Sequence, residues 1–396
     1  MTVKTTIEGG WPADAKFEPT FKSYEYFDNA YFQKELENIW FKTWLCAGHV
    51  SEIPNVGDYF TVDIAKENLI VMRAKDGSIQ TYYNVCRHRG SRLCEEQTGN
   101  FKKGYVVCPY HSWVYDGQTG NLVGTPNIPA RDCSFDKSEY PLVKAKTEVW
   151  DGLIWINLDE NAPSLKVSFA LPESWSLYEK WGMKNLKIGA QKTYQVDANW
   201  KLIMENASEC YHCGPIHPGL STCTPPGSPR QYIDENIPGS EVLKHVGGMK
   251  VRDDFQRANL DGKAYRPNFP GLDNEDARVL YYVHFYPHSY ICLASDYVFI
   301  AAMFPISTDK SIVKGFWLFE PEVLEEENPA IQDAIDIWAI TCEEDWKACE
   351  WAHAGNQSKI YKDGGVLTPI DWRVANFKKY VQEKVKEAPN PQLDLP

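Results

Sequence analysis

Two short segments decide the fold of the first half of the chain: Asn84-Val-Cys-Arg-His-Arg-Gly and Cys108-Pro-Tyr-His-Ser-Trp-Val-Tyr-Asp. Each segment supplies one cysteine and one histidine, and nineteen residues separate the two Cys/His pairs. Short runs of β-branched and aromatic residues surround them from about residue 54 to residue 158, and turn sequences such as Lys75-Asp-Gly separate these runs. This texture predicts a small antiparallel β domain.

The four candidate metal ligands in these segments are Cys86, His88, Cys108 and His111. Two Cys/His pairs on two loops can converge on one metal centre. One interpretation is a structural zinc ion bound by two thiolates and two imidazoles. The other is a Rieske [2Fe–2S] cluster, in which two thiolates bind one iron and two imidazoles bind the other. The pattern favours the cluster, because each loop supplies one residue of each kind, whereas zinc fingers more often pair two cysteines and then two histidines.

A second group of candidate ligands lies in a segment that we predict to be helical over about residues 199–213. On this helix Glu209 and His212 share one face. His217 follows the Gly214-Pro215 break, where the chain can fold back towards His212. The two histidines are candidates for a metal chelate at the helix end, and the alternative is that they are hydrogen-bonded residues of a protein core.

A carboxylate would complete a 2-His-1-carboxylate metal site. We predict a long helix from about residue 329 to residue 354. Its apolar stripe consists of Ile331, Ile335, Trp338, Cys342 and Cys349. Asp345 falls on this stripe, and a carboxylate there must be paired or metal-bound because burying it alone is costly. Glu343 and Glu344 point away from the stripe, so we expect them on a solvated face and choose Asp345 as the ligand.

Composition narrows the choice of partners. The 396 residues carry 41 Lys and Arg against 54 Asp and Glu, a formal net charge of −13, which argues against nucleic acid or an anionic membrane and permits a cationic substrate. No apolar run approaches the about 18 residues of a spanning helix, and the N-terminus lacks a secretion signal, so we expect a cytoplasmic protein. Eleven scattered cysteines predict buried thiols and a few metal ligands rather than a disulfide scaffold.

Both groups of candidate ligands closely resemble the motifs of the Rieske non-haem iron oxygenases, specifically of the terminal oxygenase (alpha) subunit. The resemblance covers most of residues 40–355. It implies that the [2Fe–2S] cluster is bound by Cys86, His88, Cys108 and His111. In this family a helix like the one predicted here gives two iron-binding histidines, and a late Glu-Asp pair gives a carboxylate. The implied ligands of a mononuclear Fe(II) are therefore His212, His217 and Asp345.

The resemblance also implies an α+β protein with three parts. Residues 1–45 would be an N-terminal helical segment that belongs to the catalytic domain. Residues 46–160 would be the small antiparallel β Rieske domain. Residues 161–396 would be a larger, helix-grip-like catalytic domain, in which helices cover an antiparallel sheet and hold the mononuclear iron.

One residue of the second segment is expected to connect the two centres. Three positions before the first iron-binding histidine, the family usually places an Asp that links the iron to the Rieske cluster of a neighbouring subunit. Glu209 holds this position here, and the alternative is a glutamate on the helix surface. Because such a link joins neighbouring chains, the resemblance implies a homotrimer.

The electrons must come from a partner, because the chain has no nucleotide-binding G-x-G-x-x-G motif after a strand and no P-loop. The resemblance implies a separate flavin and iron–sulfur reductase that draws on NADH or NADPH. The co-substrate would be O₂, and one or two oxygen atoms would enter a small-molecule substrate.

The segment Glu209-Cys-Tyr-His-Cys-Gly-Pro-Ile-His-Pro-Gly looks most like the branch of the family that oxidises quaternary ammonium compounds such as carnitine, glycine betaine or stachydrine. Monooxygenation of such a compound leads to N-dealkylation or C–N cleavage. Three alternatives remain: an aromatic-ring hydroxylating monooxygenase or dioxygenase, a Rieske electron-transfer protein without oxygenase activity, and a zinc-binding interaction module. A trimethylammonium group favours an aromatic cage, and aromatic residues are dense between Tyr281 and Phe304, although strand cores account for many of them.

Overall fold

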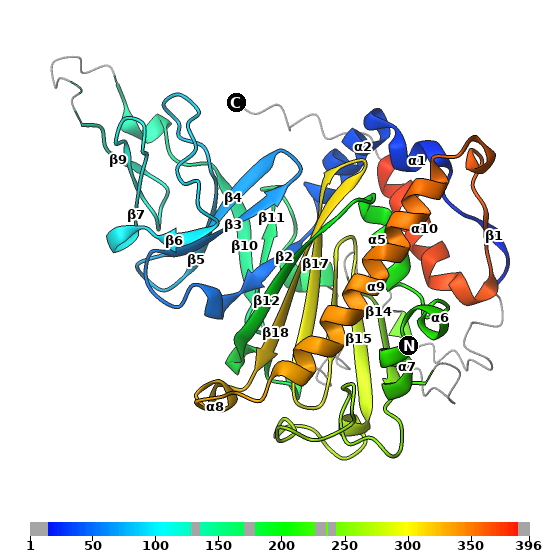
Figure 1. Ribbon diagram of the computed structural model, residues 1–396. Helices are drawn as coiled ribbons and strands as arrows, with labels where there is room; N and C mark the ends of the chain where they lie inside the picture. The colour runs from blue at the N-terminus through cyan, green and yellow to red at the C-terminus, as the bar shows by residue number, and fades with distance from the viewer. Residues whose placement is uncertain are drawn as a thin grey trace. The chain divides into compact units, whose positions relative to one another are not determined.

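The computed structural model describes residues 15–126, 128, 135–169, 179–225, 235–236 and 243–386. The chain divides into two units (Figure 1). One unit is continuous and runs from Trp44 to Leu165, and the other combines the chain before residue 44 with the chain after residue 165. The three prolines of residues 386–396 predict a loose C-terminal tail, and the part of it beyond residue 386 lies outside the described residues.

The continuous unit is built on a seven-stranded antiparallel sheet. Its strand order is β2 (Leu45–His49), β11 (Leu153–Asn157), β10 (Lys144–Trp150), β5 (Ile79–Tyr83), β4 (Glu67–Arg73), β3 (Asp58–Ile64) and β6 (Thr98–Asn100). The hairpin between β4 and β5 turns at Lys75-Asp-Gly, where Gly77 has a φ of 85° that suits glycine. The antiparallel β domain predicted from the sequence is confirmed.

A smaller three-stranded sheet completes this unit, formed by β7 (Tyr105–Val107), β8 (Val114–Asp116) and β9 (Leu122–Gly124). Asp116 closes the β8–β9 turn, because its carboxylate accepts the backbone N–H groups of Gln118 and Thr119, each at 3.0 Å. A core of buried side chains from both sheets includes Tyr82, Tyr115 and Trp113. Cys86 and Cys108 belong to the same core, so the loops that carry the two Cys/His pairs pack against it.

The other unit contains a second seven-stranded antiparallel sheet. Its strand order is β12 (Lys187–Val196), β18 (Lys310–Phe319), β17 (Val298–Ser307), β16 (Ser289–Leu293), β15 (Val279–Phe285), β14 (Leu243–Lys250) and β13 (Glu235–Asn236). Runs of β-branched and aromatic residues predict strands at about 280–286, 290–294, 297–304 and 312–319, and β15 to β18 lie within about three residues of these ranges. The central strands β16 and β17 are almost entirely buried, which explains their continuous apolar sequences.

Helices pack against this second sheet (Figure 1). The long helix α9 (Gln332–Asn356) was predicted, and the indole N–H of Trp317 on β18 donates to the carbonyl of Ala334 at 2.9 Å. Helix α9 also contacts α5 (Trp200–Ala207) and β12. On α9 the predicted stripe is confirmed for its second half, because Trp338, Cys342, Asp345 and Cys349 are all buried. The α+β class is therefore confirmed.

Three predicted elements differ from the structure. The N-terminal helical segment divides into α1 (Ser23–Phe27), α2 (Asn29–Glu35) and a π-helical turn (Leu36–Trp40), because Asp28 accepts the N–H of Tyr31 and starts a new helix. The helix predicted over 199–213 ends at Ala207. The Pro- and Gly-rich composition of residues 214–229 predicts a loop, but this segment contains the short helices α6 (Cys213–Ile216) and α7 (Pro218–Cys223), and its residues 226–229 lie outside the described residues.

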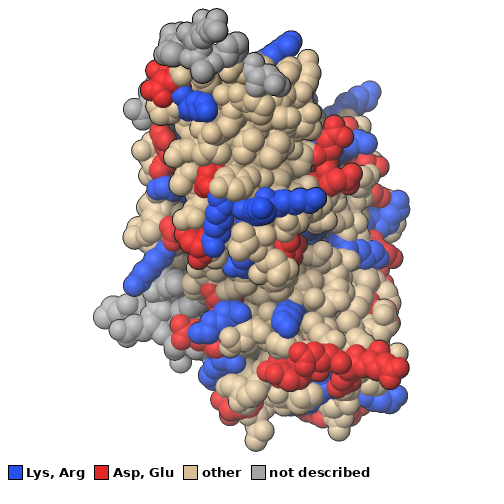
Figure 2. Space-filling model, turned by 90° about the vertical axis from the view of Figure 1, so that its left-hand side faces the viewer, with Lys and Arg blue, Asp and Glu red and all other residues tan. Residues whose placement is uncertain are grey.

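Charged side chains of both signs are interspersed on the face shown in Figure 2. Within the described part of the chain, no helix has the length and apolar character needed to cross a membrane.

Candidate metal centres

Two loops of the smaller unit present the four cysteine and histidine side chains. Cys86 and His88 follow β5, and Cys108 and His111 lie between β7 and β8. The two loops have the same internal hydrogen bonds. The N–H of Cys86 donates to the carbonyl five residues ahead at 2.8 Å, and the N–H of Cys108 does the same at 2.8 Å.

The two loops are also alike at the fourth residue after each cysteine. Gly90 and Ser112 each lie four positions after the loop's cysteine and each adopt a left-handed conformation, with φ of 71° and 57°. Their N–H groups donate to the carbonyls of Cys86 and Cys108 at 3.1 and 3.0 Å. Two loops of one geometry therefore hold one Cys/His pair each.

The cysteines and the histidines of these loops differ in exposure. Cys86 and Cys108 are 2% and 1% exposed, whereas both histidines lie at the surface with their ring centroids 4.7 Å apart. Burial raises the pKa of Cys86, to which the neighbouring Cys108 thiol contributes, and the Tyr115 hydroxyl lies 3.3 Å from the Cys86 sulfur. Paired thiols inside and paired imidazoles outside fit a two-iron cluster with segregated ligands better than a single zinc ion.

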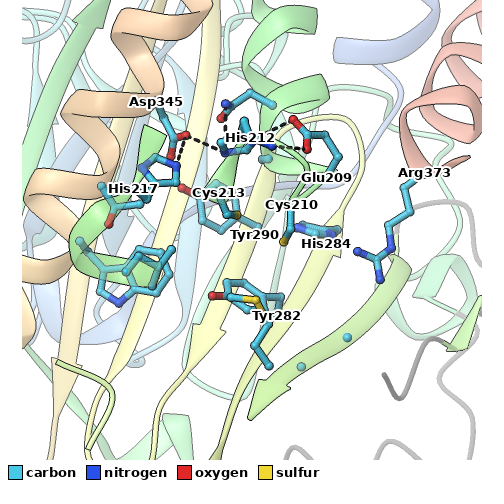
Figure 3. A pocket seen from close by; sticks show the side chains of 18 residues that line it. Glu209, Cys210, His212, Cys213, His217, Tyr282, His284, Tyr290, Asp345 and Arg373 are labelled. Carbon is cyan, nitrogen blue, oxygen red and sulfur yellow. Dashed lines mark hydrogen bonds and ion pairs between the residues drawn. The ribbon is translucent and has the colours of Figure 1, made fainter. Parts of the chain in front are cut away.

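In the larger unit, His212, His217 and Asp345 converge (Figure 3). The Oδ1 atom of Asp345 lies 2.8 Å from Nε2 of His217 and 3.2 Å from Nε2 of His212. One potential ligand atom from each residue lies within 4.8 Å of the other two. Two imidazole nitrogens and one carboxylate oxygen from one direction are the donor set of a 2-His-1-carboxylate iron site.

The helix end explains how His212 reaches this position. After Ala207 the backbone leaves the helix, and the Ser208 hydroxyl donates to the carbonyl of Met204 at 2.6 Å. The Glu209 carboxylate then accepts the backbone N–H groups of Tyr211 and His212. The prediction that Glu209 and His212 share a helical face is therefore wrong, and a carboxylate-closed turn brings them together instead.

Helix α9 provides Asp345, as predicted. Glu343 is also solvated as predicted, and its carboxylate pairs with Lys192 at 2.5 Å. The prediction for Glu344 is wrong: its Oε2 atom lies 2.8 Å from Nδ1 of His217, and its side chain is only 28% exposed. The apolar stripe did not reveal this contact, because the partner is a buried histidine from a distant segment.

The electrostatics of the three converging side chains favour positive charge. Burial opposes protonation of His212, but hydrogen bonds to Asp345 and Glu209 outweigh it and raise the pKa of His212 to about 10. Burial also opposes ionisation of Asp345, yet its bonds to the two histidines lower its pKa. A divalent cation can replace the protons that such a site attracts, so the residues fit a bound metal ion.

A pocket adjoins this site (Figure 3). Besides the three convergent residues and Glu209, its walls include Cys210, Cys213, Met249, Tyr282, His284, Tyr290, Trp338, Thr341 and Arg373. The indole of Trp338 stacks on Phe299 at a centroid distance of 4.9 Å, and the Tyr282 ring meets it edge-on at 6.2 Å. The Tyr282 hydroxyl is buried and has no hydrogen-bond partner among the described residues.

Sequence reasoning found part of this pocket. Tyr282 and Tyr290 belong to the aromatic-rich strands that it singled out, but it could not separate them from core residues such as Tyr281 and Phe285. Trp338 lies on the same stripe as Asp345, which is the only signal that could have indicated it. No sequence signal marks Arg373, which reaches the pocket from α10 (Trp372–Lys386).

Comparison with protein families agrees with both centres. Residues 43–143 match the Rieske [2Fe-2S] domain, and residues 183–387 match the ring hydroxylating alpha subunit (catalytic domain). The chain therefore belongs to the alpha subunits of the Rieske-type ring-hydroxylating oxygenases, which are O₂-using oxidoreductases. The resemblance inferred from the sequence is confirmed, together with its two cofactor types.

Within this family, the chain is similar to proteins named for quaternary ammonium compounds. It is 30% identical to the glycine betaine monooxygenase oxygenase subunit of Pseudomonas aeruginosa over 91% of this chain and 87% of that protein. The carnitine monooxygenase oxygenase subunit of Acinetobacter baumannii is 39% identical over 51% of this chain and 53% of that protein. A crystal structure of a quaternary ammonium Rieske monooxygenase with L-carnitine shares 25% identity and a TM-score of 0.76, covering 96% of this chain and 99% of that chain.

Proposed function

We propose that this chain is the oxygenase component of a multicomponent enzyme that oxidises a small quaternary ammonium compound with O₂. The observation that carries this proposal is that Tyr282, Tyr290 and Trp338 line the same pocket as the convergent residues His212, His217 and Asp345. Aromatic rings attract a cation that cannot donate hydrogen bonds, and two carboxylates, Glu209 and Asp345, add negative charge to the same walls.

The residue roles follow the geometry. Cys86, Cys108, His88 and His111 would hold the [2Fe–2S] cluster, and His212, His217 and Asp345 would hold Fe(II). When bound, the cluster supplies electrons and the iron supplies open coordination positions for O₂. Glu209 holds the ring and the backbone of His212, and the pocket walls orient the substrate and exclude water around its cationic end.

The reaction outcome depends on which carbon faces the site. Insertion of one oxygen atom into a C–H bond beside nitrogen gives a carbinolamine, which breaks down into an amine and an aldehyde. If that carbon is an N-methyl group, the products are formaldehyde and a tertiary amine that keeps the longer substituent; if it is the first carbon of the longer substituent, the products are trimethylamine and an aldehyde on that substituent. In either case two electrons and two protons accompany the reduction of the second oxygen atom to water, and a separate flavin and iron–sulfur reductase using NADH or NADPH would deliver the electrons.

The assembly is proposed to be a homotrimer. A glutamate bonded to one histidine of the mononuclear site can couple that site to a cluster carried by a neighbouring chain, as Glu209 is expected to do. Sedimentation or light scattering of the iron-loaded protein would give the mass of three chains.

Substrate-dependent oxygen uptake tests the proposed activity. Iron-loaded protein, a surrogate reductase and NADH are supplied with glycine betaine, carnitine, choline or aromatic acids, and the products are analysed for aldehyde and tertiary amine. The matched control is 3,3-dimethylbutanol, the neutral carbon analogue of choline. Uptake with the cations but not with the carbon analogue supports the proposal. Uptake with aromatic acids alone would overturn it and favour a ring-hydroxylating oxygenase.

A further inference from the structure

The imidazole of His217 is held at both of its nitrogen atoms by adjacent residues of one helix. Glu344 Oε2 lies 2.8 Å from Nδ1, and Asp345 Oδ1 lies 2.8 Å from Nε2. The ring itself is only 1% exposed, so both of its nitrogen atoms are shielded from solvent. Successive helix residues project about 100° apart, which lets two neighbouring carboxylates approach opposite edges of one ring.

The other histidine of the site has the same arrangement. Glu209 Oε1 lies 2.5 Å from Nδ1 of His212, and Asp345 Oδ1 lies 3.2 Å from its Nε2. Each imidazole therefore has a glutamate at Nδ1 and the shared aspartate at Nε2. Glu344 occupies the position at His217 that Glu209 occupies at His212.

We infer that Glu344 is the positioning residue of His217, an inference that rests on the proposed iron site. Its carboxylate can only accept a hydrogen bond, so Nδ1 must carry a proton, and the proton on Nε2, which Asp345 accepts, is the one that a metal ion at this site would replace. The bond also fixes the orientation of the ring and increases the basicity of Nε2. Glu344 is not itself placed as a ligand, because it lies at the ring nitrogen opposite to the one that faces Asp345.

The neighbouring residue provides a matched control. Glu343 has the same charge on the same helix turn, but its side chain is 61% exposed and pairs with Lys192 rather than with the site. A charge effect acting at long range would therefore act through both glutamates, whereas a positioning effect would act through Glu344 alone.

The test measures Fe(II) affinity by chelator competition in the absence of substrate, for the wild-type protein and for Glu344→Ala, Glu344→Gln and Glu343→Gln. Glu344→Ala is expected to weaken Fe(II) binding about 10- to 100-fold, the usual effect of losing a group that orients a metal ligand. Glu344→Gln keeps an acceptor oxygen of the same reach and should recover part of this loss. Glu343→Gln should match the wild type.

A spectroscopic measurement separates positioning from general destabilisation. The EPR signal of the nitric oxide complex of the Fe(II) site should change in symmetry in Glu344→Ala, while the visible absorption of the [2Fe–2S] cluster stays the same. Fe(II) affinity and EPR signals in Glu344→Ala and Glu344→Gln that equal those of Glu343→Gln would overturn the inference but leave the proposed function intact. Failure of the wild-type protein to bind Fe(II) at this site would overturn both.

Discussion

The carboxylate of Glu209 binds His212 twice. Its Oε1 atom lies 2.5 Å from Nδ1 of the ring, and its Oε2 atom accepts the backbone N–H at 3.1 Å. One side chain therefore sets both the path of the backbone after α5 and the orientation of the imidazole. Because the bond to Nδ1 leaves Nε2 facing Asp345, we expect Glu209 to orient His212 for metal binding, in addition to its proposed role as a link between centres.

Glu209→Gln separates these roles. The amide can still accept a hydrogen bond, so we expect Fe(II) content and cluster content close to those of the wild type. Loss of the negative charge should slow re-oxidation of the reduced cluster by about 10-fold or more when substrate and O₂ are added in a single turnover. Stopped-flow absorbance measures this rate, with Glu350→Gln on α9 as the control. An unchanged rate would assign Glu209 a purely structural role.

Asp345 should be required for one metal and not for the other. Its carboxylate is the point on which both histidines converge, so Asp345→Ala removes the shared ligand and should abolish binding of Fe(II) at this site. The cluster ligands belong to the other unit, and the visible absorption of the cluster should persist. Metal analysis and absorption spectra of the same sample check both expectations, and the control is Asp336→Ala, which removes a half-buried carboxylate of α9 that accepts a hydrogen bond from Gln332. Parallel loss of iron and cluster would contradict this separation.

Two glycines with a left-handed backbone provide a third prediction. Gly90 and Gly77 both have positive φ, 71° and 85°, and an added Cβ would meet no atom within 4 Å at either position. Gly90→Ala and Gly77→Ala should therefore each cost about 1–2 kcal/mol through backbone strain alone. Only Gly90 lies in a cluster loop, so only Gly90→Ala should hasten bleaching of the cluster in air. Equal bleaching rates in the two variants would show that the loop geometry is not what protects the cluster.

The sequence predicts the proposed cluster site more completely than the proposed iron site. The candidate cluster ligands lie in two local motifs, and each motif lies in its own loop, so residue order was enough to single them out. The candidate iron ligands were also chosen from the sequence, and the structure brings them together, but the geometry around them was not predicted. Glu209 acts through a turn that it closes itself, and Glu344 acts on a histidine 127 positions away in the chain. Helical periodicity carries no information about either contact, because both depend on tertiary packing.

Trp338 should determine how well the pocket holds a cation. Its indole is stacked on Phe299, and its N–H donates to the Tyr297 hydroxyl at 3.1 Å, so its position is fixed. Trp338→Leu removes an aromatic surface worth about 1–2 kcal/mol to a desolvated cation, which corresponds to about a 5- to 30-fold increase in KM. Trp338→Phe should recover part of this loss. Trp351, which lies exposed on the same helix, is the control, and an equal effect of Trp351→Leu would contradict the assignment.

Glu205 should make the stability of the larger unit depend on pH. Burial raises its pKa to about 8 from an ordinary value of 4.5, although the Tyr26 hydroxyl donates to the carboxylate at 2.9 Å and Lys201 opposes the shift. Between these two values the folded protein keeps a proton that the unfolded chain releases, so the free energy of unfolding falls as pH rises from about 4.5 to about 8 and is level above that.

Replacing Glu205 by glutamine mimics the protonated side chain and should remove the fall in the free energy of unfolding with rising pH. Denaturant unfolding should show Glu205→Gln close to the wild type near pH 4.5 and increasingly more stable than it towards pH 8, because only the wild type must keep a proton that its unfolded chain gives up. Glu350→Gln, which changes a carboxylate on α9 that pairs with Lys347, is the control. A constant stability difference between Glu205→Gln and the wild type at every pH would mean that Glu205 is ionised in the folded protein, with Lys201 compensating its charge.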